Sequence, residues 1–215
     1  MSARMNTQNS AQDNAVALRK RLREARANVP ADERRRGALL MRGRLFTWLG
    51  VNRDAAVSEG RQAPRSVAAF WPMEDEPDLR PLLSQWADAG ITVLLPVIEE
   101  TRAPLRFHPW TPNTPMRPGA YGIPVPPLGT PARPDVVLVP TLGYTRQADR
   151  LGYGGGYYDR TLAALRESGP SPVTIGIAWT EGRIDDPDYQ AAPHDVRLDA
   201  ILTPAGWLPA APAPR

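Results

Sequence analysis

The 215-residue sequence contains no cysteine, so it cannot form a disulfide, a thiolate nucleophile or a zinc site built on cysteine. No apolar run approaches the roughly 20 residues that a membrane-spanning helix needs. The polar start, Met1 to Asn14, also lacks the apolar core of a signal peptide. These absences exclude disulfide-stabilised and membrane-spanning classes of protein, and we expect a soluble cytoplasmic protein without a membrane partner.

Lysine is almost missing as well, since Lys20 is the only lysine among 26 basic residues. Residues 1–48 hold 11 basic and 4 acidic side chains, a charge of +7, whereas the rest of the chain carries −4. A basic segment at residues 19–44 could bind nucleic acid, but it lacks interleaved aromatic residues and a groove-binding motif. We therefore expect no nucleic-acid partner. The arginines form either a solvated helix face or a site for a polyphosphate.

Helix and strand patterns alternate along most of the chain. The patterns predict a disordered lead-in at residues 1–14, helices at 15–27 and 30–50, and a polar loop at 51–65. Further helices are predicted at 78–89 and 157–167, with strands at 66–71, 91–97, 104–108, 136–139, 173–178 and 200–202. This order favours an α/β fold: one three-layer α/β/α domain at 15–208 with a mainly parallel sheet and N-terminal helices. The segment after Pro204 is rich in proline and alanine, so we expect a frayed tail, with its main part at residues 209–215.

The most informative segment is the glycine-rich run at 150–160, Arg-Leu-Gly-Tyr-Gly-Gly-Gly-Tyr-Tyr-Asp-Arg, which leads straight into a predicted helix. Its glycines let backbone N–H groups approach a ligand without Cβ obstruction, and the helix N-terminus favours an anion. Arg150 could neutralise phosphate, and Asp159 could bind Mg2+, which needs only one or two carboxylates. The run lacks the Lys-Ser/Thr pair of a Walker loop. It predicts a phosphate site; the alternative is a flexible turn in which Asp159 caps the helix.

This run resembles the signature of the 5-formyltetrahydrofolate cyclo-ligase family, Arg-Leu-Gly-x-Gly-x-Gly-Tyr-Tyr-Asp. Three further segments resemble that family's motifs in the same order, namely Trp71–Glu76 with Asp78, Tyr121–Pro126 and His194–Asp199, and the resemblance covers residues 15–203. It implies a ligase that uses ATP and Mg2+ to convert 5-formyltetrahydrofolate into 5,10-methenyltetrahydrofolate, ADP and phosphate. The route would be phosphorylation of the formyl oxygen followed by ring closure through N10.

The resemblance also assigns roles to particular residues. It implies that ATP binds at Arg19, Arg150, Leu151, Gly152, Tyr153, Gly154, Gly155, Gly156, Tyr157 and Tyr158. It implies that the folate, with or without a polyglutamate tail, binds at Trp71, Glu76, Tyr121, Tyr153, Gly154, Gly155, Gly156 and Tyr157. Asp159 and Asp195 would hold Mg2+, and the catalytic residues would be Arg150, Tyr157 and Asp159. The enzyme is expected to be a monomer.

Each assignment has an alternative. Trp71 could be a core aromatic residue, Glu76 a solvated carboxylate and Asp195 a turn cap, while Arg21 or Arg23 could replace Arg19 at ATP. The chain also departs from the family pattern: Ala15 replaces a lysine, Ile98 an aromatic residue, and Thr145 and Ala148 an aspartate and a glycine. These departures leave open a divergent relative that binds nucleotide but has another ligand or a regulatory role.

Overall fold

The structure is a computed structural model that describes residues 2–186, 189–192 and 195–213, with side chains from residue 14 onward. A seven-stranded sheet with the order β11-β10-β9-β6-β1-β2-β3 forms its centre. The five inner strands are parallel and the two edge strands antiparallel. Their bounds are β1 Ser66–Ala68, β2 Thr92–Val97, β3 Arg106–Trp110, β6 Val136–Pro140, β9 Val173–Ile177, β10 Ala200–Thr203 and β11 Gly206–Leu208. β6, β9 and β10 are buried along their whole length, because both faces of a parallel sheet are covered.

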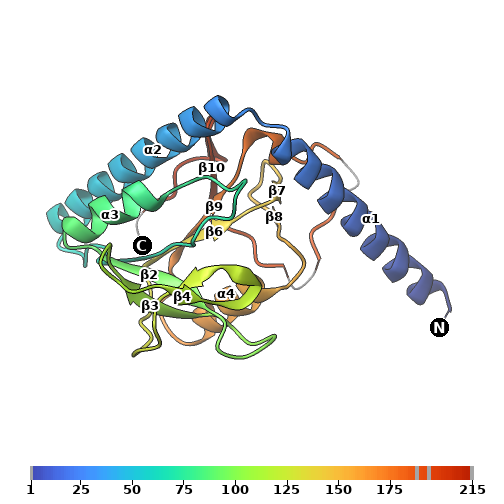
Figure 1. The fold of residues 1–215 in the computed structure, drawn as a ribbon. Coiled ribbons are helices and arrows are strands. Elements are labelled where there is room, and N and C mark those ends of the chain that lie inside the picture. Colours follow the sequence, from blue (N-terminus) through green and yellow to red (C-terminus); the bar gives the residue numbers. More distant parts are fainter. Residues whose placement is uncertain (1, 187–188, 193–194, 214–215) are drawn as a thin grey trace.

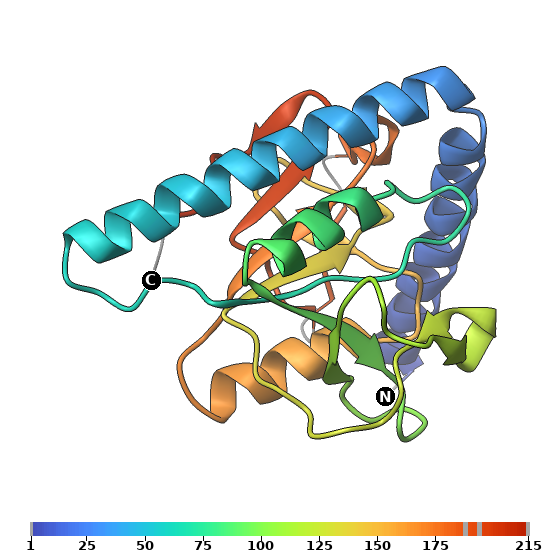
Figure 2. The ribbon, with the colours of Figure 1, turned by 60° about the vertical axis from the view of Figure 1, so that its left-hand side comes forward.

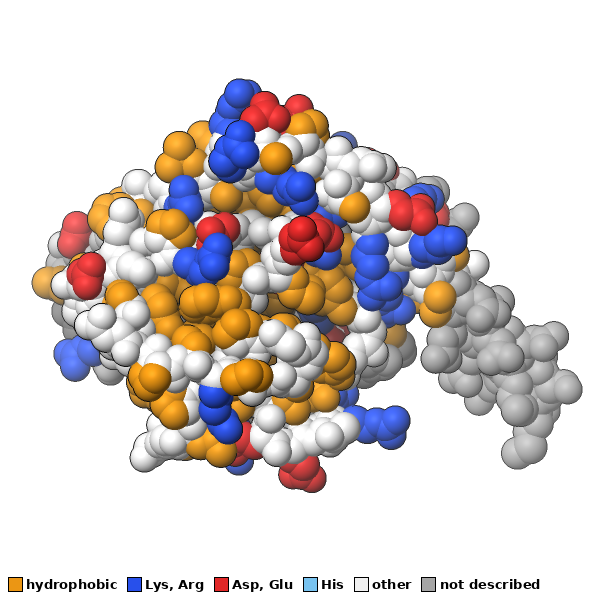
Figure 3. All heavy atoms as spheres, viewed as in Figure 1, with side chains coloured by type: hydrophobic (Ala, Val, Ile, Leu, Met, Phe, Trp, Pro, Cys, Tyr) orange, Lys and Arg blue, Asp and Glu red, His pale blue; other side chains and the backbone are white. Residues whose placement is uncertain are grey.

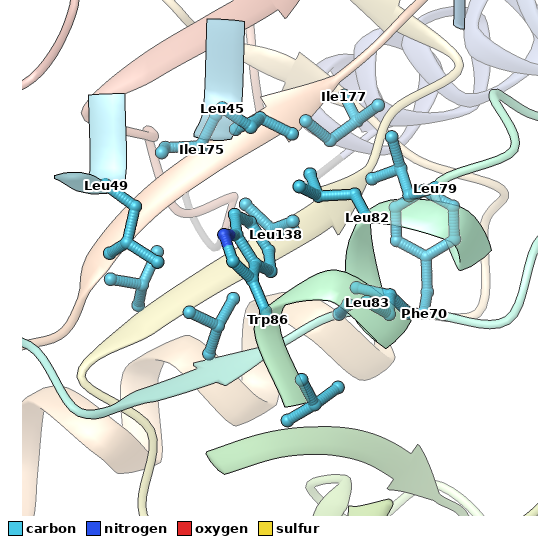
Figure 4. Close-up of a cluster of buried hydrophobic side chains, with 14 of the residues drawn as sticks. Leu45, Leu49, Phe70, Leu79, Leu82, Leu83, Trp86, Leu138, Ile175 and Ile177 are labelled. Atoms are coloured by element: carbon cyan, nitrogen blue, oxygen red, sulfur yellow. The ribbon is translucent and has the colours of Figure 1, made fainter. Parts of the chain in front are cut away.

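Helices cover the two faces of this sheet, which confirms the predicted α/β class and its three layers. α2 (Ala31–Ser58) and α3 (Arg80–Asp88) lie on one face, and α4 (Tyr157–Glu167) lies on the other (Figures 1 and 2). Leu45 and Leu49 of α2 meet Leu82 and Trp86 of α3 above the inner strands (Figure 4). The smaller cluster on the opposite face includes Leu162 of α4.

The first helix, α1 (Ser2–Ala27), stands outside these layers and runs away from the body toward the N-terminus (Figure 1). Its C-terminal half rests on the short hairpin of β7 (Gly143–Tyr144) and β8 (Arg150–Leu151), where Leu22 joins Leu142, Leu151 and Ile184 in a separate apolar cluster. A second small hairpin, β4 (Arg117–Pro118) and β5 (Pro124–Val125), carries Tyr121 at its turn, within the 3-10 helix η1 (Ala120–Gly122). Another 3-10 helix, η2 (Thr180–Gly182), lies beside α1.

The structure differs from the expected local structure in three places. Residues 2–14, predicted as a disordered lead-in, are helical, because they contain neither proline nor glycine that would stop α1. α2 continues past Gly50 to Ser58, since an internal glycine costs only about 1 kcal/mol and Ala56 is buried on the core side. The segment after Pro204 forms β11 along the edge of the sheet, and the Pro212 carbonyl accepts a hydrogen bond from the Trp48 indole at 2.8 Å.

The orientation of α2 can be tested by truncating one leucine on each of its sides. Leu45→Ala is expected to lower the free energy of unfolding by about 2–5 kcal/mol, because it opens a cavity against the sheet. Leu39→Ala, on the exposed side, is expected to change it by less than about 1 kcal/mol. Urea denaturation followed by tryptophan fluorescence measures both variants. Equal losses would contradict the orientation of the helix.

Candidate active site

A cavity of about 560 Å3 opens at the carboxyl ends of the inner strands. Phe70 and Trp71, which follow β1, line it together with Pro96 of β2 and Pro140, the last residue of β6. The direction of the chain connections reverses between β1 and β6, and ligands of open α/β sheets bind at such a switch point. In Figure 3, hydrophobic side chains gather in the middle of the face shown, with basic side chains beside them.

The glycine-rich run forms the wall where β8 turns into α4. Gly154 and Gly156 adopt φ angles of 97° and 65°, in the left-handed region that only glycine enters without strain. A Cβ on Gly152 would lie 2.4 Å from Nη1 of Arg150, so a larger residue here would force the Arg150 side chain to move. Because Gly156 is the N-cap of α4, it brings no side chain that could cap the first-turn amides of the helix.

Three arginines of α1 reach the same cavity. Nε of Arg19 donates to the Gly152 carbonyl at 3.0 Å, and Nη2 of Arg23 donates to the Tyr153 carbonyl at 3.4 Å. Arg26 also lines the cavity, whereas Arg21 is exposed. Residues 19, 23 and 26 lie on one face of a helix, so their spacing was a signal that could have picked them out from the basic run.

A buried ion pair lies at the base of the glycine-rich run. Nη2 of Arg150 contacts both carboxylate oxygens of Asp159, at 2.9 and 2.8 Å, and the two side chains are only 5% and 10% exposed. The backbone N–H of Val196 donates to the same carboxylate at 3.3 Å. Asp159 is therefore the partner of Arg150, a role that the sequence analysis did not consider.

Asp159 and Asp195, the predicted Mg2+ ligands, both line the cavity. Oδ2 of Asp195 accepts a hydrogen bond from the Ala192 N–H at 2.8 Å. Within the described residues no group of three or more acidic, histidine or cysteine side chains could hold a metal by itself. Two carboxylates at one cavity fit Mg2+, which takes one or two protein carboxylates and completes its shell with water and ligand oxygens, but Asp159 would have to share its oxygens with Arg150. His194 of the same motif lies outside the described residues.

Glu76 also lines the cavity; it is buried, and hydrogen bonds hold both of its oxygens. One accepts from the Tyr153 hydroxyl, and the other accepts from the Met73 N–H at 2.9 Å. Burial raises the pKa of Glu76 above its ordinary value, while the hydrogen bonds and nearby Arg26 oppose the shift. Glu76 is therefore no solvated loop carboxylate.

The aromatic residues of the cavity lie in two places. Trp71 is half-buried and packs edge-on against Trp110, with ring centroids 6.1 Å apart, so it belongs to the core as well as to the cavity wall. Tyr121 is 79% exposed and stands on the β4–β5 hairpin. Hydrogen bonding to Tyr157 of the glycine-rich run raises the pKa of Tyr121. Tyr157 and Tyr121 thus connect the hairpin to the start of α4.

Residues 11–204 match the 5-formyltetrahydrofolate cyclo-ligase family. The chain belongs to this family. The chain is 32% identical over 196 residues to the 5-formyltetrahydrofolate cyclo-ligase of Mycolicibacterium smegmatis, an alignment that covers 87% of this chain and 92% of the relative. It is 29% identical to the Haemophilus influenzae cyclo-ligase, over 81% of this chain and 88% of the relative. The assignment confirms the predicted family and identifies the protein as a ligase.

Solved structures support the fold of this cyclo-ligase family member. The 5,10-methenyltetrahydrofolate synthetase of Aquifex aeolicus superposes with a TM-score of 0.70 at 24% identity, over 90% of this chain and 91% of that one. The Mycoplasma pneumoniae synthetase gives 0.61 at 23% identity, over 88% and 98%. Among the described residues no helix is both long and apolar enough to cross a membrane.

Two of the departures from the family pattern lie in the turn before Arg150. The Thr145 hydroxyl donates to the Asp149 carboxylate at 2.8 Å and accepts from the backbone N–H groups of Gln147 and Asp149. Ala148 is buried at φ 65°, a conformation that suits glycine better. Ile98, the third departure, lines the cavity. The turn is thus held by Thr145 in this cyclo-ligase.

The raised pKa of Glu76 predicts how Glu76→Gln changes stability with pH. The ordinary pKa of glutamate is about 4.3, so between that value and the raised pKa the folded protein binds more protons than the unfolded chain. The contribution of Glu76 to the free energy of unfolding therefore falls as pH rises through this window. Glutamine does not ionise, so the stability of Glu76→Gln relative to the parent should rise with pH there and then stay constant.

Urea denaturation at a series of pH values from about 4 to 8 measures this difference. Glu100→Gln is the matched control, because Glu100 is exposed. A difference between Glu76→Gln and the parent that does not change with pH would contradict the proposed shift.

Proposed function

We propose that this protein binds 5-formyltetrahydrofolate and ATP in the one cavity and cyclises the folate to 5,10-methenyltetrahydrofolate in an ATP- and Mg2+-dependent reaction. The observation that carries the proposal is the position of Tyr153. Its backbone belongs to the glycine-rich run that meets the arginines of α1, while its hydroxyl bonds to Glu76, which lines the same cavity. The proposed phosphate-binding run and a buried carboxylate are thus neighbours in one cavity, and a reaction between two bound substrates needs such proximity.

We assign the ATP phosphates to the glycine-rich run. Backbone N–H groups and the N-terminus of α4 suit an anion, and Arg19 supplies positive charge beside them, whereas the charge of Arg150 is balanced by Asp159. Asp159 and Asp195 would hold Mg2+, which neutralises negative charge on a transferring phosphoryl group when it is bound. Asp159 contacts Arg150 with both oxygens here, so Mg2+ binding would shift at least one of these oxygens from the arginine to the metal and leave Arg150 freer to meet phosphate.

We assign the folate to the apolar part of the cavity. Its volume lies within the range of roughly 300–1,000 Å3 typical of small-molecule sites. Trp71 and Phe70 provide aromatic surfaces, and Ile98 and Ile123 aliphatic ones, for a ring system. The Glu76 carboxylate can accept hydrogen bonds from the N–H groups of a pterin ring. Tyr121 and Tyr157 would flank the remainder of the substrate.

The chemistry follows from what a formamide lacks. Its carbonyl carbon is a weak electrophile and its oxygen a poor leaving group. In the proposed reaction the formyl oxygen attacks the γ-phosphorus and ADP leaves, which gives an N5-iminium phosphate. N10 then attacks the formyl carbon, phosphate departs with the oxygen, and N10 loses its proton. The protein supplies position and charge rather than a nucleophile, which agrees with a site that contains no cysteine.

The proposed reaction has a direct assay, which follows the near-ultraviolet absorbance of the methenyl product. Purified protein is expected to give this signal only when 5-formyltetrahydrofolate, ATP and Mg2+ are all present. ATP binding without turnover would instead favour the divergent relative, to which the turn at Thr145 and Ala148 points. Strongly salt-dependent binding to DNA or RNA would favour the nucleic-acid alternative. The cytoplasmic location and the monomeric state stay predictions from the sequence.

The role of Asp159 is tested by Asp159→Asn. We expect kcat to fall by about 100-fold or more, as when one electrostatic stabiliser is lost, and the Mg2+ concentration needed for half-maximal rate to rise. Asp54→Asn, at an exposed position of α2, is the control. Circular dichroism shows whether the variant folds without the partner of Arg150. Near-parental turnover with unchanged Mg2+ dependence would refute the metal assignment.

A further inference from the structure

Arg26 is a buried arginine to which neither the family motifs nor the proposed chemistry gives a role. It extends from the last turn of α1 and is only 8% exposed. Nη1 donates to the Tyr153 hydroxyl at 2.6 Å, and Nη2 donates to Oδ2 of Asp75 at 3.3 Å. The guanidinium also lies 5.4 Å from the centre of the Tyr153 ring. A buried arginine with these partners is held firmly in one place.

The hydrogen bonds around Arg26 have only one possible direction. A guanidinium can donate but cannot accept, so the oxygen of Tyr153 must accept from Arg26. The single proton of that hydroxyl is then directed to its other neighbour, Oε1 of Glu76. Because the Met73 N–H donates to Oε2, both oxygens of Glu76 are fixed in place. Arg26 thus determines the orientation of Glu76 through Tyr153.

The charge of Arg26 acts on the same carboxylate. Burial raises the pKa of Glu76, and the nearby positive charge of Arg26 opposes that rise. Burial and the charge of Glu76 raise the pKa of Tyr153, so the hydroxyl stays protonated and remains a donor. Asp75 provides a counter-charge, and its carbonyl accepts a hydrogen bond from the Trp179 indole at 2.7 Å. Asp75 and Arg26, the charged neighbours of Glu76, are therefore both held in position.

We propose that Arg26 is a positioning residue for the folate subsite: from α1 it holds the Tyr153 hydroxyl so that Glu76 presents its carboxylate to the substrate ring. This inference rests on the proposed function, because it assumes that Glu76 meets the folate. Arg19 and Arg23 of the same helix contact the glycine-rich run. α1 therefore contacts the glycine-rich run directly and, through Arg26 and Tyr153, also positions the Glu76 carboxylate.

The inference is tested by Arg26→Gln, with Arg26→Lys as the conservative variant. Arg26→Gln is expected to raise the KM for 5-formyltetrahydrofolate by about 10- to 100-fold, the range for a hydrogen bond to a charged group. It is expected to change kcat and the KM for ATP by less than about 3-fold, since Arg26 bonds to the Tyr153 hydroxyl and Asp75 and not to the backbone of the glycine-rich run. Arg26→Lys keeps the positive charge but cannot bond to Tyr153 and Asp75 at once as the guanidinium does. Its KM for 5-formyltetrahydrofolate should therefore lie between those of the parent and Arg26→Gln.

The pH profile separates a positioning role from a merely structural one. Without the positive charge the pKa of Glu76 rises further, so the acidic limb of kcat/KM for folate should move to higher pH in Arg26→Gln. In Arg26→Lys it should stay near its parental position. Nuclear magnetic resonance of the carbon-13-labelled Glu76 carboxyl reports the same change without turnover. Arg21→Gln, which removes one charge from the exposed side of α1, is the control and should leave every value unchanged.

Each outcome bears on one statement. An Arg26→Gln variant with parental folate KM and an unmoved acidic limb would overturn the role of Arg26. So would equal rises in both KM values with an unmoved Glu76 titration, which would mean a general loss of structure. Failure of the parent protein to bind or convert 5-formyltetrahydrofolate would instead refute the proposed function, which the same assay reveals before any variant is compared.

Discussion

The turn through Gly154 and Gly156 is the constraint on which the rest of the site depends. Left-handed backbone at both positions redirects the chain from β8 into α4 within a few residues. This turn places Tyr157, Tyr158 and Asp159 in the first turn of the helix, against the carboxyl ends of the parallel strands. It also brings Asp159 back to Arg150, nine positions earlier. A side chain at either glycine would strain the turn and displace the first turn of α4.

Buried polar groups concentrate around that turn, and burial of such groups opposes stability. The Arg150–Asp159 pair and Glu76 are all nearly inaccessible to solvent. Nε of Arg150 and the hydroxyl of Tyr158 are buried without a hydrogen-bond partner among the described residues. Burial also raises the pKa of Tyr158, so its hydroxyl keeps its proton. Native proteins leave few buried polar groups unsatisfied, and such groups at a cavity wall agree with a site shaped for ligands rather than for stability alone.

The regular elements were predictable wherever one local signal dominated. α4 begins at Tyr157 and ends at Glu167 as predicted, because glycines precede it and an apolar stripe follows. β6 and β9 were predicted from continuous β-branched runs, which are typical of strands buried on both faces. α2 was cut short at Gly50 because glycine is a weak stop signal, and packing of Ala56 carries the helix onward. β11 was missed because a Pro/Ala-rich segment has no strand pattern, and only the exposed edge of β10 makes it one.

The sequence by itself determined the fold class, the family and the glycine-rich run as a candidate phosphate site, because hydrophobic spacing, family motifs and glycine positions can all be read along the chain. It also nominated Glu76, Trp71 and Asp159. Only the tertiary structure showed that Asp159 pairs with Arg150 and that Tyr153 joins the glycine-rich run to Glu76. It likewise separated Arg19, Arg23 and Arg26 from the other arginines of the basic segment. These contacts join residues up to 133 positions apart. Helical spacing puts Arg19, Arg23 and Arg26 on one face of α1, but their partners follow from how α1 packs against the rest of the fold, which the spacing does not give.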